Sequence, residues 1–443
     1  MRMPLGVVPL LALTLLVGPL QTGSGASTAP TGGAMLPVTT ADRSSSPSPT
    51  ASAVRHVRLT RWSGQRLLLG TSLHSRLHGA GLQVARSAPT IHYDDPFGSV
   101  PPIDYDRGFW YSPWVEPGFD LTQLIASYDA KTPVGTFIEV AARGRTPAGR
   151  RTSWDSLGRW ASSDHQFHRM SLGPQRDDLT RVAVDTLVTT HGVSLSGWQV
   201  RVALLRRTGT SATPTLTQIG AVGSRLPAAQ STTSTSRFHR GRDLSVPRYS
   251  QEIHTGEYPR YNGGGEAWCS PTTTAMLLSY FDRGPTPRQL RWIDPSYRQP
   301  WVDHAARSTF AWGYDGTGDW PFNTAYAGEF GLDTFVTRLR SLREAELFIR
   351  AGIPLAASIA FGPGELDHAP IQSTAGHLVV IRGFTDRGGV VVNDPAAPTA
   401  NTVRRVYRRG QFERAWTGST GGVVYVMHPA RTPLPEPRRH PNW

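Results

Sequence analysis

Cysteine is almost absent from the sequence, because the 443 residues contain only one, Cys269. A lone cysteine cannot form a disulfide within the chain, so the fold must be stable without one. The thiol is then either a small buried hydrophobic side chain or a reactive nucleophile. The residues around Cys269 decide between these two interpretations.

Lysine is equally scarce, since Lys131 is the only one. It lies in the segment Asp129-Ala130-Lys131-Thr132, which lacks the upstream glycine of a phosphate-binding loop, so a nucleotide-driven motor is not expected. Arginine supplies the remaining positive charge, and the formal net charge is +13. The arginines are spread through both halves of the chain, which indicates a solvated surface, and we expect no nucleic-acid partner.

Long apolar runs are limited to one, near the N-terminus. Arg2 precedes an apolar stretch over residues 5–20, and small residues at 24–26 offer a cleavage site, so residues 1–26 are predicted to be a signal peptide. An uncleaved anchor is the alternative, although Pro9 and Gly18 interrupt the stretch. We expect a secreted protein, extracellular or at the cell surface, that makes no membrane contact after cleavage.

Composition divides the rest of the chain into polar segments and two folded parts. Segments 27–54, 226–245 and 430–443 are poor in large apolar residues, which predicts a disordered leader, an interdomain linker and a disordered tail. Residues 55–225 show short alternating runs, which predict an all-β antiparallel sandwich of a jelly-roll-like kind. Residues 246–429 mix helix and strand patterns and predict an α+β domain.

Period-two alternation in the predicted sandwich is clearest over residues 198–204, where the large apolar side chains share one face, and at Ile138, Val140 and Ala142. An aromatic cluster over residues 109–114 has two interpretations. Its rings can fill the core between two sheets, or they can stack on the sugar rings of a glycan.

Cys269 directly precedes a predicted helix. Pro271 suits a first helical turn, where a missing N–H costs nothing, and residues 272–281 continue the helical pattern. The unpaired N–H groups and positive dipole end of a helix stabilise a thiolate. Three glycines at 263–265 would let a substrate backbone approach closely. These features favour a nucleophile over an inert core cysteine.

A thiolate nucleophile needs a base, and His377 lies at the start of an apolar strand that can position it. His368 is the weaker candidate, because it lies in a loop. A second strand ends on Asp394, which can accept the other imidazole N–H and fix the tautomer, unless it is a plain turn residue. A hairpin turning symmetrically at residues 387–388 would leave Asp394 about 13 Å along the strand from the residue facing His377. The triad therefore requires an earlier turn or a β-bulge.

Four segments together resemble the stand-alone relatives of the bacteriocin-processing endopeptidases, which cleave double-glycine leaders and form a papain-like cysteine peptidase family. In chain order these segments are Val246-Pro247-Arg248-Tyr249-Ser250-Gln251, Cys269 with Pro271, Gly376-His377 and Asn393-Asp394-Pro395. The resemblance covers residues 246–428 and leaves out the predicted sandwich. It implies a papain-like fold for the C-terminal part.

The resemblance also implies roles for four residues. Cys269 would be the nucleophile, His377 the general base and acid, Asp394 the residue that orients the imidazole, and Gln251 the oxyanion donor. Gln251 stands eighteen positions before Cys269, further than is usual in papain-like enzymes. The backbone N–H of Cys269 and the side chain of Asn262 are alternative donors.

We therefore expect a secreted cysteine peptidase that hydrolyses peptide bonds through a Cys-His-Asp triad and a thioester acyl-enzyme. No cofactor or metal is expected, the substrate is a protein or peptide, and the sandwich is a candidate for cell-wall or glycan contact. One alternative is a peptidoglycan amidase or peptidase of similar fold. Another is a non-catalytic glycan-binding protein of the cell surface.

Overall fold

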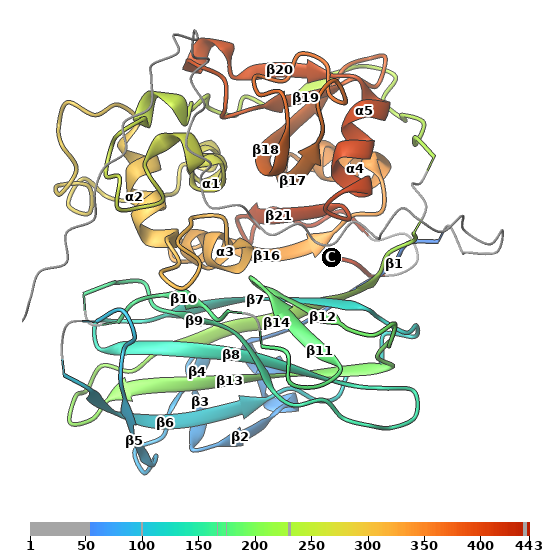
Figure 1. Ribbon diagram of the computed structural model, residues 1–443. Coiled ribbons are helices and arrows are strands. Elements are labelled where there is room, and N and C mark those ends of the chain that lie inside the picture. Colours follow the sequence, from blue (N-terminus) through green and yellow to red (C-terminus); the bar gives the residue numbers. More distant parts are fainter. Residues whose placement is uncertain (1–53, 99–100, 166, 174, 229–231, 437–440) are drawn as a thin grey trace, which may run out of the picture. The chain divides into compact units, whose positions relative to one another are not determined.

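Alternating residues build two antiparallel sheets in the N-terminal part of the chain (Figure 1). The computed structural model describes residues 54–443 except 99–100, 166, 174, 229–231 and 437–440. The predicted signal peptide and nearly all of the predicted leader therefore lie outside the described residues.

The first sheet has seven strands in the order β11-β12-β7-β14-β4-β3, with β1 also paired to β14. Its strands are β1 (His56–Ser63), β3 (Ser75–His78), β4 (Gly81–Val84), β7 (Gln123–Lys131), β11 (Thr180–Ala183), β12 (Thr186–Thr189) and β14 (Thr215–Arg225). The second sheet has the order β10-β9-β8-β13-β6-β2, with β5 also paired to β6. Its strands are β2 (Thr71–Leu73), β5 (Thr90–Tyr93), β6 (Ile103–Tyr111), β8 (Thr136–Arg145), β9 (Asp155–Trp160), β10 (Met170–Ser171) and β13 (Gly197–Arg207). The prediction of an all-β antiparallel N-terminal part is confirmed.

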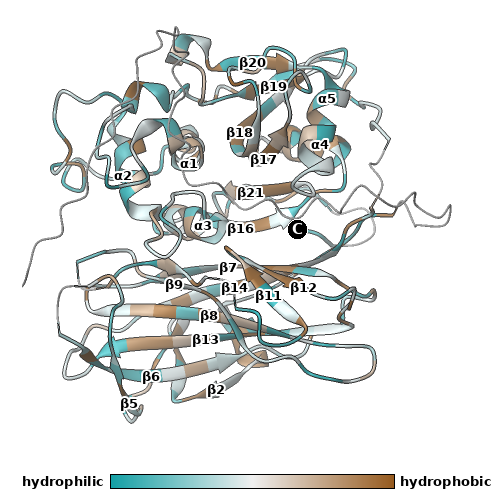
Figure 2. Cartoon of the chain, in the orientation of Figure 1, coloured by the Kyte–Doolittle hydropathy of each residue, from teal (hydrophilic) through white to brown (hydrophobic). Residues whose placement is uncertain are grey.

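Tryptophans link the two sheets. Trp62 of β1 packs edge-on against Trp110 of β6 and Trp198 of β13, with ring centroids 5.7 and 5.9 Å apart. Of the aromatic cluster over residues 109–114, Trp110 is fully buried, whereas Phe109 and its other aromatic neighbours are half-buried. Hydrophobic and hydrophilic residues are mixed along these strands in Figure 2, as expected for sheets buried on one face.

The C-terminal part combines helices with a third seven-stranded sheet, in the order β16-β21-β17-β18-β19-β20 with β15 paired to β18. The strands are β15 (Arg242–Asp243), β16 (Asp333–Arg338), β17 (Leu355–Phe361), β18 (Thr374–Phe384), β19 (Val390–Asn393), β20 (Arg404–Tyr407) and β21 (Val423–His428). The helices are α1 (Cys269–Tyr280), α2 (Pro300–Thr309), α3 (Trp320–Gly328), α4 (Leu342–Arg350) and α5 (Arg409–Glu413). This mixture of helices and strands confirms the α+β prediction for this part.

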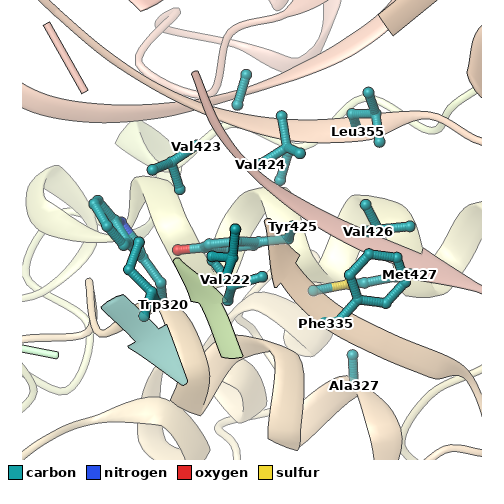
Figure 3. Packing of buried hydrophobic residues seen from close by; sticks show 14 of the residues in the cluster. Val222, Trp320, Ala327, Phe335, Leu355, Val423, Val424, Tyr425, Val426 and Met427 are labelled. Atoms are coloured by element: carbon teal, nitrogen blue, oxygen red, sulfur yellow. The ribbon is translucent and has the colours of Figure 1, made fainter. Parts of the chain in front are cut away.

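Buried apolar side chains of β21 belong to the main hydrophobic cluster (Figure 3). Phe335 of β16 and Trp320 of α3 belong to the same hydrophobic cluster, and so does Val222 of β14. Polar contacts also join β16 to β7 and β14, because Thr334 donates to Asp129 Oδ1 at 2.6 Å and Gln218 Nε2 donates to the Thr334 carbonyl at 2.8 Å.

Two segments predicted to be linker and tail make ordered contacts where they are described. In the linker, the Ser234 hydroxyl donates to Glu413 at 2.7 Å, and β15 pairs with β18. The prediction of a disordered tail is wrong for its last residues. Asn442 is buried and donates to the Arg338 carbonyl at 2.8 Å, and the Trp443 ring packs 5.0 Å from that of Phe348. The Pro- and Arg-rich composition of the tail gave no sign of these contacts of Asn442 and Trp443.

Candidate active site

Cys269 is the first residue of helix α1, as the sequence predicts. Trp268 precedes it and fixes the start of the helix. Its carbonyl accepts from the Thr272 N–H at 3.0 Å, and its buried indole donates to the Tyr261 carbonyl at 2.6 Å. Cys269 is half-buried, so the residue is not enclosed in the core.

The glycines before Cys269 serve the chain itself. A Cβ on Gly265 would lie 2.3 Å from the Gln251 carbonyl oxygen and 2.5 Å from the backbone carbon of His254. The missing side chain therefore makes room for residues 251–254, and not for substrate as the sequence suggested. Gly264, with φ of 100°, adopts a backbone conformation that other residues rarely reach.

A β-bulge brings Asp394 toward His377. Strand β18 pairs with β19 with an irregularity between Ile381 and Gly383, beyond which Val380 pairs with Asn393. Asp394 directly follows Asn393, whose partner Val380 lies three positions after His377 on β18. The bulge meets the geometric requirement set by the sequence, and His377 Nε2 lies 2.7 Å from Asp394 Oδ1.

The bulged residue, Arg382, is held in place by several acceptors. Its guanidinium donates to Asp243 Oδ1 at 2.6 Å and to Asn393 Oδ1 at 3.0 Å. Asn393 in turn donates to the Pro247 carbonyl at 2.9 Å. These contacts fix the end of β19 and therefore the position of Asp394.

Asp394 is fully buried and has a hydrogen-bond donor at both carboxylate oxygens. Oδ2 accepts from the Tyr407 hydroxyl at 2.7 Å, and Oδ1 accepts from the Ala396 N–H at 3.1 Å as well as from His377. Burial alone would raise the pKa of Asp394, but His377 and these donors outweigh it and lower the pKa. The carboxylate is thus held in its charged form.

His377 is 3 % exposed and lies between Asp394 and Cys269. Burial would lower its pKa, but the charge and hydrogen bond of Asp394, together with the hydrogen-bonding and electrostatic contribution of Cys269, raise the pKa to about 10. Since Asp394 engages Nε2, Nδ1 is the nitrogen left for the thiol. The structure therefore brings together the cysteine, histidine and aspartate selected from the sequence.

Gln251 lies beside the same group of residues. Its N–H donates to the Pro395 carbonyl at 2.9 Å, next to Asp394, and its side-chain amide donates to the Glu266 carbonyl at 2.6 Å, in the segment before Cys269. The long spacing in the sequence is taken up by the loop between these contacts. Asn262, the alternative donor, is half-buried in a left-handed turn with φ of 56°.

Glu252 is a half-buried ionisable residue beside Gln251 that sequence reasoning did not consider. Burial and then Glu266 raise its pKa, whereas the charge of His377 acts to lower it. The only signal in the sequence is its position directly after Gln251. His368, the rejected base, is exposed in a loop with φ of 64°.

Two family models match the chain. Residues 57–224 match the model of the Peptidase C39 N-terminal domain, and residues 243–424 match that of the Peptidase C39 like family. The chain is a relative of the C39 papain-like cysteine peptidases. Both parts of this C39 relative, the paired sheets and the mixed domain, are thus covered by C39 family models.

Two solved structures are similar to part of this chain. A putative C39-like peptidase from Bacillus anthracis is 15 % identical, with 42 % of this chain and 96 % of that chain covered and a TM-score of 0.27. A fragment of prointerpain A from Prevotella intermedia is 16 % identical, with 46 % and 77 % covered and a TM-score of 0.28. No curated protein matches. Among the described residues, no helix has the length and apolar character needed to cross a membrane.

Proposed function

We propose that the protein is a secreted cysteine peptidase in which Cys269, His377 and Asp394 form the catalytic triad. The observation that carries the proposal is the position of His377, which is shared between a fully hydrogen-bonded carboxylate and a half-buried thiol at a helix N-terminus. A pKa of about 10 keeps this imidazole protonated at neutral pH, so a thiolate–imidazolium pair can form with Cys269.

In the proposed reaction, Sγ of Cys269 attacks the carbonyl carbon of a peptide bond. The carbonyl oxygen becomes an oxyanion, and the imidazolium of His377 gives its proton to the leaving amine nitrogen, so that the C–N bond breaks and a thioester remains. His377 then removes a proton from water, whose oxygen attacks the thioester carbon; the C–S bond breaks, the acid is released and the Cys269 thiolate is restored beside the imidazolium. Asp394 holds the imidazole orientation through both steps.

Gln251 is the proposed oxyanion donor, together with the backbone N–H of Cys269. Its amide is 3 % exposed and is anchored to both the segment before Cys269 and the segment after Asp394. A donor held in place before the substrate arrives stabilises the oxyanion without a cost of reorganisation.

The test is cleavage by the purified mature chain of an unfolded protein substrate and, separately, of purified cell walls. Cleavage of the protein, with new N-termini, supports the peptidase, whereas release of wall peptides alone would favour the peptidoglycan amidase or peptidase. Cys269→Ala, which removes only the sulfur, should abolish either activity. Cleavage that survives in Cys269→Ala would contradict the proposal.

A second function, contact with an anionic cell-wall glycan, is favoured by the outer face of sheet β10-β9-β8-β13-β6-β2, in what we take to be a jelly-roll-like sandwich. The Arg143 guanidinium lies 4.4 Å from the Trp154 ring and 5.2 Å from that of Trp114. Burial and then repulsion by the nearby Arg151 and Arg201 lower the pKa of Arg143. Such a face suits a polymer that carries negative charge.

Sedimentation of the chain with purified cell walls tests this contact. Arg143→Gln combined with Arg151→Gln should reduce the bound fraction several-fold at low salt, whereas Arg76→Gln, on the exposed strand β3, serves as the matched control. Equal binding by the double variant and the control would exclude this face as the glycan contact.

A further inference from the structure

A second buried group of ionisable side chains lies apart from the triad, on the turn after Gln251. His254 and Glu257 come from this turn, and Asp303 comes from the first turn of helix α2. His254 Nδ1 lies 2.6 Å from Glu257 Oε2 and 3.4 Å from Asp303 Oδ2, and one ligand atom from each of the three residues fits within 4.8 Å.

The hydrogen bonding of this group is incomplete. His254 and Asp303 are both 0 % exposed. In the part of the chain that the structure describes, neither carboxylate oxygen of Asp303 accepts a hydrogen bond, and Nε2 of His254 has no partner either. A buried carboxylate without donors is costly, so this site requires a further positive or donor group.

The charges of the group also do not balance. Two carboxylates face one imidazole, and no described arginine or lysine pairs with either carboxylate. The protein thus holds excess negative charge in a place with little water.

We propose that His254, Glu257 and Asp303 bind one divalent transition-metal cation, and that Zn²⁺ is the ion that fits. One imidazole nitrogen and carboxylate oxygens are typical Zn²⁺ ligands, whereas Ca²⁺ and Mg²⁺ prefer oxygen alone. Ligand atoms on a tetrahedral Zn²⁺ lie about 3.3 Å apart. The 3.4 Å between His254 Nδ1 and Asp303 Oδ2 is close to this value, whereas the 2.6 Å between Nδ1 and Glu257 Oε2 is a hydrogen-bond distance that must lengthen when the ion binds. Of the three side chains only that of Glu257 is in contact with solvent, with 12 % of its surface exposed.

The site is placed to stiffen the turn that carries Gln251. The His254 N–H donates to the Gln251 carbonyl at 3.0 Å, and the His254 ring lies 5.9 Å from that of Trp268, the residue before Cys269. A cation bound to His254 and Asp303 would cross-link this turn to α2. This consequence for catalysis rests on the proposed peptidase function, but the binding itself does not.

Binding is measured on the full mature chain, free of any tag, after chelator treatment. The Cys269→Ala background prevents Zn²⁺ from binding the catalytic thiol, so the result does not depend on whether the chain is a peptidase. Titration calorimetry and thermal melting with ZnCl₂, MnCl₂ and CaCl₂ should show one Zn²⁺ per chain, weaker Mn²⁺ and no Ca²⁺. A hundredfold excess of Zn²⁺ over its Kd should raise Tm by about 3–5 °C.

Two variants, each tested in that background, keep the proposal falsifiable if one fails to fold. Asp303→Asn and Glu257→Gln preserve shape, and each should weaken Zn²⁺ binding at least about 100-fold. Asp294→Asn, an exposed acid on the preceding loop, is the matched control and should bind like the parent. The proposal is overturned if the parent binds no Zn²⁺, or if Asp303→Asn binds it as tightly as Asp294→Asn.

Discussion

Two of the imidazole–carboxylate pairs among the described residues, His377–Asp394 and His254–Glu257, differ in how completely the polar atoms around them are satisfied. His377 Nε2 and Asp394 Oδ1 are 2.7 Å apart, and His254 Nδ1 and Glu257 Oε2 are 2.6 Å apart. Both carboxylate oxygens of Asp394 accept hydrogen bonds. Asp303, which lies beside the second pair, accepts none from the described residues. Similar distances therefore do not imply similar roles.

The difference suggests what each pair is built to do. A carboxylate with all its donors in place holds one imidazole orientation and one charge state, as proton transfer requires. A carboxylate group with missing donors is suited to receive a cation.

The largest effect is expected at the carboxylate of the first pair. Asp394→Asn keeps the shape but presents the wrong group to His377, so kcat/KM should fall about 10³–10⁴-fold. Asp386→Asn, in the turn of the same hairpin, is the control. A loss of less than about tenfold in Asp394→Asn would show that the first pair is structural and that the contrast between the pairs is false.

The next effect concerns the turn that connects the two pairs. Gln251→Ala should lower kcat by about 10²–10³-fold, as expected for the loss of one oxyanion donor. The exposed Gln289→Ala is the matched control. If kcat stays within threefold of the parent, the oxyanion is held by other groups, such as the backbone N–H of Cys269.

The charge state of the first pair predicts a pH dependence. The pKa of His377 is raised from 6.5 to about 10, so the stability that its protonated form contributes is fully present below pH 6.5 and is lost as pH rises toward 10. The rate constant kcat/KM should fall about tenfold per pH unit above 10, because the imidazolium is lost. In Asp394→Asn the fall of kcat/KM should begin at lower pH. If it begins at the same pH as in the parent, the group that titrates is not His377.

The smallest effect is expected from removing one donor to Asp394. Tyr407→Phe deletes a hydrogen bond to a buried charge, which should cost about 1.5–3 kcal/mol of unfolding free energy in denaturant titrations and lower kcat/KM only about tenfold or less. Tyr297→Phe is the control for loss of a tyrosine hydroxyl. A larger loss of activity than in Asp394→Asn would contradict the role given to the carboxylate.

The sequence predicted the parts of the site that depend on local pattern. Pro271 and the apolar residues after it identified the helix that begins at Cys269, and the apolar run before Asp394 identified its strand. The requirement for an early turn or a bulge could be stated, but its position at Arg382 could not, because it depends on Asp243, far away in the chain.

Other features could not be predicted, because they arise from contacts between distant segments. The role of Gly265 depends on the approach of Gln251 and His254, and the Asp303 contact depends on how α2 packs beside that turn. The buried C-terminal residues were missed for the same reason, since Asn442 is ordered by Arg338, on strand β16. Composition alone gives no information about such partners.

The central claim, that Cys269 is activated by His377, is tested most directly by the rate at which a thiol-reactive probe modifies the chain. Only one cysteine is present, so mass spectrometry reports that site alone. At pH 6 the folded chain should be labelled at least about tenfold faster than the denatured chain, and His377→Ala should remove the difference. Labelling of the folded chain that is no faster than that of the denatured chain would contradict the claim.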